Sequence, residues 1–185
     1  MTDEPLFRDA ESCVKFAFAI CEASMCAAPA YLKVLVRETT KRTRRALGMS
    51  QLDWQAQGVM IRRRIADLDP MLVAYVWANY SRGVERETAV QMISGYVASS
   101  LGSVRNQPLL AMLVRRHADH IRAHRASIAK IAKESGCSED WAKEVDIRVR
   151  KILADLHSGA FDRLDQQFTD AGMIVHPEGM PLVGC

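Results

Sequence analysis

Apolar residues recur three and four positions apart along almost the whole chain, and this spacing restricts the fold more than any other feature. Such a repeat gathers apolar side chains on one face of an α-helix, whereas a half-buried strand requires strict alternation of apolar and polar residues. The chain contains no clean alternating run of β-branched residues. With 185 residues, 49% of them hydrophobic, it is long enough to bury a sizeable core. The sequence therefore predicts an all-α fold, a multi-helix bundle.

Breaks and capping residues divide this pattern into separate helices. Ser50 can cap a helix through its hydroxyl, and Pro70 after Asp69 suits a first helical turn. The predicted helices span residues 11–25, 30–47, 51–68, 71–80, 85–101, 127–135 and 139–156, with another opened by Pro108 and a short one at 160–171. The residues expected in the core of the third helix are Trp54, Met60, Ile61 and Ile65. A break at Gly102-Ser103 divides a helical region at 1–101 from a second region at 102–173, before a loose tail at 174–185.

The chain carries none of the short signatures of the common catalytic and nucleotide-binding sites. G-x-x-x-x-G-K-[ST], G-x-G-x-x-G, H-E-x-x-H and G-x-S-x-G are all absent. The five cysteines include no C-x-x-C pair, which indicates reduced thiols, and the longest apolar stretches fall short of the roughly 20 residues that span a bilayer. We therefore expect a cytoplasmic protein that is not an enzyme, has no cofactor or metal and does not bind a membrane.

The most specific stretch lies at residues 127–145 and has the spacing of a helix-turn-helix. Ala132 supplies the small residue that lets a second helix cross the first closely, and Gly136 follows four positions later, where the corner requires a positive φ. Ser138 can cap the second helix. The core stripe of that helix consists of Val145, Val149, Ile152 and Leu156. This pattern favours a nucleic-acid-binding motif, and an ordinary corner between two core helices is the alternative.

Charged residues surround this motif on both of its predicted helices. Residues 115–151 carry ten basic against six acidic residues, and such a concentration favours a polyanionic partner. The residues expected at DNA are Ser138, Glu139, Asp140, Lys143, Glu144, Arg148 and Lys151 on the second helix, with Lys130 and Lys133 on the first. The three carboxylates repel phosphate, although a carboxylate can accept a hydrogen bond from cytosine N4. We therefore expect weak or selective binding of double-stranded DNA.

A second basic block lies at residues 33–64, which carry nine basic against two acidic residues. Cations three and four positions apart crowd one side of a helix, and an anionic partner would relieve their repulsion. DNA, nascent RNA or an acidic protein surface could each be that partner, and a solvated helix end with local salt bridges is the alternative. The residues of the predicted basic patch are Lys41, Arg42, Arg44, Arg45, Arg62, Arg63 and Arg64, together with Arg115 and Arg116.

Three histidines open a different interpretation. His117, His120 and His124 fall at i, i+3 and i+7, so a helix would place them on one face. Three imidazoles with an open fourth position can form a hydrolytic zinc site, and a zinc-dependent enzyme is therefore an alternative function. The surrounding arginines, which would repel a dication, are Arg115, Arg116, Arg122 and Arg125. We therefore favour histidines that add cationic character to a basic helix.

Two segments of the chain have an order of features that is known from one protein family. The first, from Leu109 to Leu156, contains Val114-Arg115-Arg116-His117 at a helix end, the Ile128 to Gly136 helix, Cys137-Ser138, and a long helix with Val145, Val149 and Ile152. It resembles region four of bacterial sigma factors, which also occurs in the phage late-gene antitermination proteins of the Q family. The second contains Asp53 to Ile61, Leu68-Asp69-Pro70 and Ala78-Asn79-Tyr80, and it is similar to the middle of those phage proteins.

This resemblance implies both a function and its partners. Proteins of the Q family bind DNA close to a late promoter, engage paused RNA polymerase and remain with it as it becomes resistant to terminators. For this chain the resemblance implies a helix starting at Glu139 that faces DNA, and contacts between the helices of residues 33–101 and RNA polymerase in a bacterial host cell. The alternative within the same class is another phage DNA-binding protein, such as a repressor or a small terminase subunit.

Overall fold

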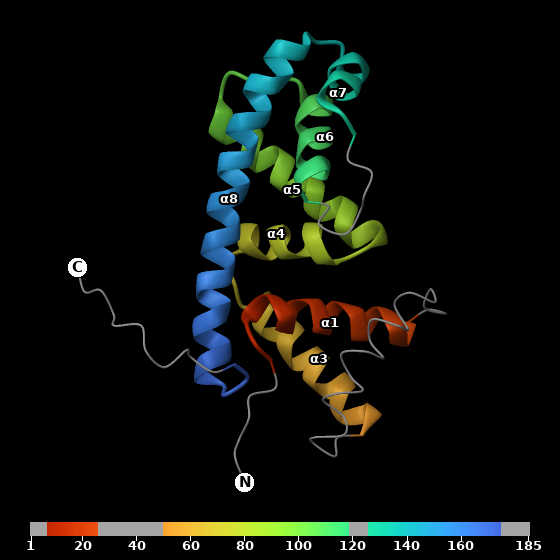
Figure 1. The fold of residues 1–185 in the computed structure, drawn as a ribbon, viewed down its shortest axis with the longest axis vertical. Coiled ribbons are helices and arrows are strands. Elements are labelled where there is room, and N and C mark those ends of the chain that lie inside the picture. Colours follow the sequence, from red (N-terminus) through yellow and green to blue (C-terminus); the bar gives the residue numbers. More distant parts are fainter. Residues whose placement is uncertain (1–6, 26–49, 119–125, 175–185) are drawn as a thin grey trace, which may run out of the picture. The chain divides into compact units, whose positions relative to one another are not determined.

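The computed structural model describes residues 7–25, 50–118 and 126–174, and every regular element in these ranges is a helix. The elements are α1 (Ala10–Met25), α3 (Gln51–Ala66), α4 (Pro70–Tyr80), α5 (Gly83–Leu101), α6 (Gln107–His117), α7 (Ile128–Ser135) and α8 (Glu139–Asp170), drawn in Figure 1. The all-α prediction is confirmed. The helix predicted at residues 30–47 and the tail beyond residue 174 lie outside the described residues. None of the described helices has the length and apolar character needed to cross a membrane.

The chain forms two compact units, and they do not divide where the sequence suggested. One unit contains the described residues up to Asp67 and those from Phe161 onward, and the other runs from Leu68 to Ala160. The boundary expected at Gly102 was wrong, because α5 and α6 on either side of it pack against each other. Gly102, with φ +55°, ends α5 and lets the chain turn back, so the glycine marks a reversal inside one unit.

The first unit is built around α1 and α3, which pack against each other. Val14 and Phe18 on α1 and Ile61 and Ile65 on α3 are all buried, as the spacing of apolar residues predicts. Met60 was expected in the core, but it is exposed because it lies about 100° around α3 from Ile61.

The last ten residues of α8 complete the first unit. Leu164 and Phe168 are fully buried there, and the side-chain Oδ1 of Asp165 accepts a hydrogen bond from the backbone N–H of Ala10 at 3.1 Å. Beyond the helix end, Phe7 donates its backbone N–H to the carbonyl of Met173 at 3.2 Å. Segments more than 150 positions apart in sequence therefore share one core.

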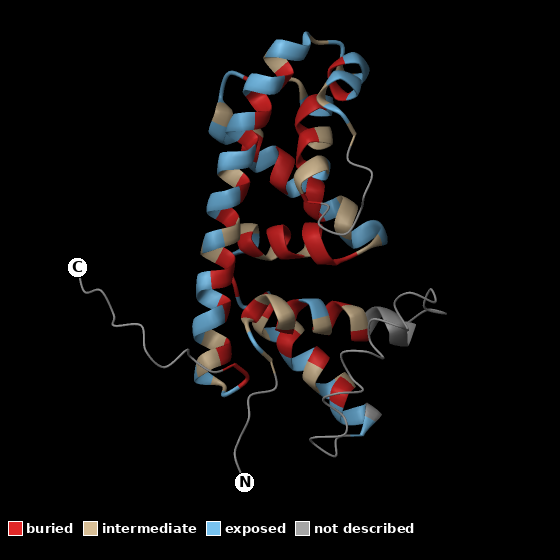
Figure 2. Cartoon of the chain, in the orientation of Figure 1, coloured by how far each residue is buried: buried red, intermediate tan, exposed pale blue. Residues whose placement is uncertain are grey.

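The second unit consists of α4 to α7 and the first part of α8. α4 packs on α5, α5 on α6, and α6 on α7. α4 contributes much of the core of this unit, and Figure 2 shows buried residues along its length. Those residues are Leu72, Ala74, Tyr75, Val76, Ala78, Asn79 and Tyr80. Tyr75 also contacts α8 through its hydroxyl, which lies 3.3 Å from Nδ1 of His157.

Capping residues set the starts of these helices as predicted. Ser50 Oγ accepts from the N–H of Asp53 at 3.2 Å, and the Asp53 carboxylate accepts from the N–H of Ser50 at 2.7 Å, which is a complete capping box. Asp69 caps α4 by accepting from the N–H of Met71 at 3.0 Å. The Asp9 carboxylate caps α1 by accepting from the N–H of Ser12 at 2.7 Å. This cap was not predicted from the sequence.

α8 is one continuous helix of 32 residues, so the predicted interruption between residues 156 and 160 was wrong. Gly159 lies inside the helix, where glycine costs about 1 kcal/mol relative to alanine. Burial of Ala160, Phe161 and Leu164 immediately after it outweighs this cost, since one fully buried large apolar side chain contributes about 1.5–3 kcal/mol. The same helix therefore serves both units.

Candidate nucleic-acid interface

The corner between α7 and α8 turns at Gly136, the glycine that the sequence pattern placed there. Gly136 adopts a left-handed conformation with φ +68°. The N–H of Cys137 bonds the carbonyl of Ala132 at 3.0 Å, and the N–H of Gly136 bonds that of Lys133 at 3.4 Å, which together form a Schellman motif. Ser138 then accepts from the N–H of Trp141 at 3.4 Å and begins α8.

Small and branched apolar residues pack inside this corner. Ala132 on α7 and Ala142 on α8 are both buried, which is consistent with two helices that cross closely. Val145 and Val149 continue the buried face of α8, as expected from their spacing. Ala142 was not singled out from the sequence.

α6 positions α7 from both ends. At the start of α6, Asn106 caps the helix by accepting from the N–H of Leu109 at 3.1 Å, and its amide donates to the carbonyl of Ser135, the last residue of α7, at 3.0 Å. At the end of α6, the guanidinium of Arg116 donates to the carbonyl of Ala126, two residues before α7 begins. The Asn-x-Pro order at residue 106 could have indicated the cap, but not the second hydrogen bond.

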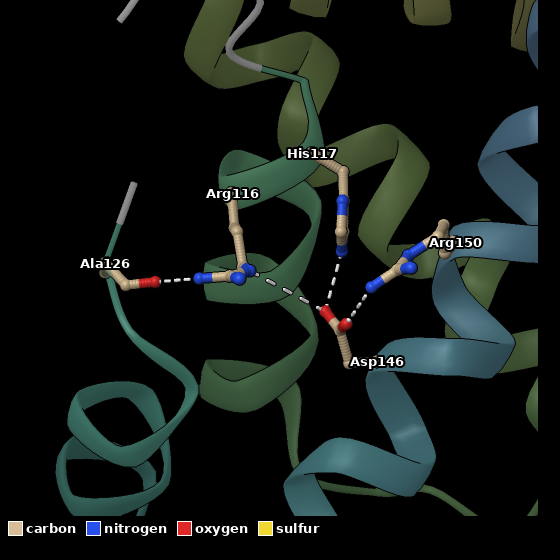
Figure 3. A network of polar contacts seen from close by, with 5 residues as sticks. All are labelled: Arg116, His117, Ala126, Asp146 and Arg150. Carbon is tan, nitrogen blue, oxygen red and sulfur yellow. Dashed lines mark hydrogen bonds and ion pairs between the residues drawn. The ribbon is translucent and has the colours of Figure 1, made fainter. Parts of the chain in front are cut away.

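A buried carboxylate on α8 joins that helix to α6, as shown in Figure 3. Asp146 Oδ1 lies 2.6 Å from Nε2 of His117 and 4.0 Å from Nε of Arg116, both on α6. Asp146 Oδ2 accepts from the guanidinium of Arg150, one turn further along α8, at 2.9 Å. Asp146 thereby fixes the rotation of α8 relative to α6.

All nine residues predicted to face DNA are exposed, so none of them belongs to the core. Several of the charged ones pair with one another along their own helix. Lys143 Nζ lies 3.0 Å from Glu139 and 3.5 Å from Asp140, Arg148 pairs with Glu144, and Lys130 lies 3.8 Å from Glu134. The hydrogen bond to Glu139 raises the pKa of Lys143. The cations of this surface are therefore partly neutralised before any partner arrives.

The described residues of the predicted basic patch are divided between the two units. Arg62 lies over the ring of Phe18, 5.2 Å from its centroid, and Arg64 reaches the carbonyl of Gln167 at 3.5 Å, both in the first unit with the exposed Arg63. In the second unit, the exposed Arg115 pairs with Glu87 at 2.6 Å. Lys41, Arg42, Arg44 and Arg45 lie outside the described residues.

Arg116 was expected on the surface of this patch, and that prediction was wrong. Its side chain is only 22% exposed and is directed toward Asp146 and the carbonyl of Ala126. The Nε atom of Arg116 is buried and donates no hydrogen bond within the described residues. Arg116 therefore supports the α7–α8 corner from inside and does not present its charge to a partner.

His117 is the only one of the three predicted zinc ligands that the structure describes. Its Nε2 is occupied by Asp146, while His120 and His124 lie outside the described residues. Within the described ranges, no group of three or more His, Cys, Asp or Glu residues could hold a metal ion.

No protein-family model matches the chain, and no curated protein matches it. The α7–α8 corner is thus the strongest indication of function.

Proposed function

We propose that the protein is a phage-type transcription antitermination factor that binds double-stranded DNA near a promoter through α7 and α8. It then remains with RNA polymerase, which reads through terminators as a result. The single observation that carries the proposal is the α7–α8 corner, with its left-handed Gly136 and its buried Ala132 and Ala142. The resemblance of the chain to sigma region four and to the Q family supports the same function.

The α8 surface is suited to selective binding more than to strong general attraction to DNA. The start of a helix carries partial positive charge, which favours a nearby phosphate. Glu139, Asp140 and Glu144 oppose that attraction, and they also pair with Lys143 and Arg148. The phosphate contribution is therefore small, and binding depends on contacts that a particular sequence provides.

Contact with RNA polymerase is proposed for the helices that precede α6. α3 exposes Leu52 and Val59, and α5 exposes Val84, with 83% of its surface accessible, and Met92. Exposed apolar side chains of this kind are typical of protein-binding surfaces when they lie close together on one helix face. Leu52 and Val59 are seven positions apart, which is about two helical turns, so they lie on the same side of α3.

The test combines DNA binding, polymerase capture and transcription through a terminator. The variant Lys143→Glu, Arg148→Glu, Lys151→Glu reverses three exposed cations of α8, and we expect it to lose specific DNA binding and terminator readthrough. The matched control is Lys15→Glu, Arg105→Glu, Arg163→Glu, which changes the net charge equally at exposed positions elsewhere. The proposal fails if the tagged wild-type protein captures no RNA polymerase, or if both triple variants behave alike.

A different DNA-binding function, as a phage repressor or a small terminase subunit, is the second candidate. It is favoured by the exposed face of α5, on which Val84, Met92 and Tyr96 recur at intervals of four and eight residues and could pair with a second copy. A repressor should be a dimer and a terminase subunit a ring. Light scattering on the purified protein separates these candidates, because the antitermination function does not require either assembly.

A further inference from the structure

Ile147 is the one large hydrophobic residue that is exposed on the described parts of α6, α7 and α8. Its accessible surface is 66% of the maximum. It lies seven positions after Asp140, three after Glu144 and four before Lys151, so all four share the outer face of α8. These three neighbours are exposed and charged. An isolated apolar side chain therefore stands at the centre of a polar surface.

A single exposed apolar residue is common on protein surfaces, but this one is held in a fixed direction. Asp146, the preceding residue, is buried and bonds His117 at 2.6 Å. That contact prevents rotation of α8 about its axis, and Ile147 points about 100° away from it. A β-branched residue is also a weaker helix former than the leucine, lysine or glutamate that could replace it there. Helix stability gives no reason for isoleucine at this position.

We propose that Ile147 contacts the C5 methyl group of a thymine in the major groove and is a specificity-determining residue of this protein. The inference rests on the proposed function, in which α8 enters DNA. The thymine methyl is the apolar group that base edges present in the major groove, and apolar side chains recognise it. An apolar side chain at the centre of the DNA-facing surface can pack against that methyl group, whereas it can form neither an ion pair nor a hydrogen bond with a phosphate.

The cations around Ile147 have a spacing that suits this placement. Lys143 and Lys151 lie four residues before and four residues after it on the same face. Eight residues of helix are about 12 Å long, which is comparable to the major-groove width of about 12 Å. The two ammonium groups can therefore reach phosphates on either side while Ile147 faces the base edges.

The test removes the methyl group and the isoleucine separately. A pool of randomised 30-base-pair duplexes is selected on the wild-type full-length protein, and each thymine of the selected duplex is then replaced by deoxyuridine, which lacks only the C5 methyl. We expect one such replacement to weaken wild-type binding roughly fourfold, the value for one buried methyl-sized group. Ile147→Ala should lose a similar factor on the thymine duplex and show no further loss on the deoxyuridine duplex.

Two further variants serve as controls. Val59→Ala truncates another exposed apolar residue, on α3 in the first unit, and should bind both duplexes like the wild type. Ile147→Val retains the branched shape and should show an intermediate loss. Thermal unfolding measured by circular dichroism should be the same for all these variants, because both residues are exposed.

The outcomes separate this inference from the proposed function. If the wild type binds DNA but no deoxyuridine effect depends on Ile147, or if the selected duplex contains no thymine in its recognised core, the inference is wrong and DNA binding stands. If the wild type selects no DNA, both are wrong. If Ile147→Ala binds DNA normally but captures less RNA polymerase, Ile147 belongs to a protein contact and the inference is again overturned.

Discussion

Asp146 is the single charged residue that is buried within the described part of the chain. Its carboxylate contacts His117, accepts from Arg150 and lies near Arg116, so its removal would leave the largely buried His117 and Arg116 side chains without this partner. Breaking a buried ion pair from one side costs about 3–5 kcal/mol. We therefore expect Asp146→Ala to lower the free energy of unfolding in urea by about that amount.

Arg150→Ala is the matched control for this prediction. The Arg150 side chain is 64% exposed, and exposed ion pairs contribute about 0–1 kcal/mol. Its removal should therefore change stability by less than about 1 kcal/mol. Equal effects of the two substitutions would show that Asp146 is stabilised by its exposed partner and does not join α6 to α8.

Asp9 provides a pH-dependent contribution at the start of α1. Hydrogen bonding from Ser12 lowers the pKa of Asp9 below its ordinary value of 3.8. A lowered folded-state pKa means that the ionised carboxylate stabilises the fold at pH values above 3.8, and that this contribution disappears as the pH falls through the folded-state pKa.

Asp9→Asn tests this contribution because asparagine is also a good N-cap but carries no charge. We expect the wild type to be more stable than the variant at pH 6, and the difference to shrink steadily below pH 4, as the carboxylate becomes protonated. Urea unfolding at a series of pH values measures the difference. A difference that stays constant from pH 6 to pH 2 would contradict the assignment.

At the scale of elements, the turn between α7 and α8 depends on one glycine. Gly136 has φ +68°, where any other L-residue except asparagine or aspartate is strained by about 1–2 kcal/mol. Gly136→Ala should destabilise the protein by about this amount, although a Cβ at Gly136 would meet no atom within 4 Å. The whole cost therefore arises from the backbone and can be measured by urea unfolding.

Gly95→Ala gives the opposite result for the same change of side chain. Gly95 lies inside α5 with no atom within 4 Å of its added Cβ, and alanine is a better helix former by about 1 kcal/mol. We expect it to stabilise the protein. If Gly136→Ala were equally stabilising, the left-handed conformation of Gly136 at the end of α7 would be incorrect.

The sequence predicted individual helices well because their signals are local. Ser50, Asp69 and Gly136 each act within four residues of their position, and each has the predicted role. The interruption predicted near Gly159 failed because the burial that holds α8 together there comes from residues further along the helix. A local breaker is outweighed by tertiary packing that the local pattern does not reveal.

At the scale of the whole molecule, the division into units depends on contacts that no local pattern contains. Ala10 bonds Asp165, and Phe7 bonds Met173, across more than 150 positions. The candidate site shows the same limit. The α7–α8 spacing predicted its corner, but no sequence pattern indicated the contacts by which Asn106 and Asp146 join that corner to α6.

The charge of the whole molecule sets the last prediction. The net charge is only +3, so under the proposed function the attraction to DNA would depend on which cations are free of ion pairs. On α7 and α8, Lys133 and Lys151 form no ion pair with another described residue, whereas Lys143 and Arg148 do. Each phosphate contact contributes about −0.9 to the slope of log K against log salt concentration. The wild-type slope should therefore be shallow.

Releasing the paired cations should make that slope steeper. Glu139→Gln with Glu144→Gln removes the nearer partner of Lys143, leaving Asp140 at 3.5 Å, and removes the partner of Arg148. We therefore expect the slope to become more negative by between about 0.9 and 1.8, with tighter binding at low salt. Asp162→Asn with Asp170→Asn removes two exposed charges from the other end of α8 and is the control. Both double variants raise the net charge by two. A slope that changes equally in both would show that overall charge matters, whereas a change confined to the first would place the DNA at the outer face of α8.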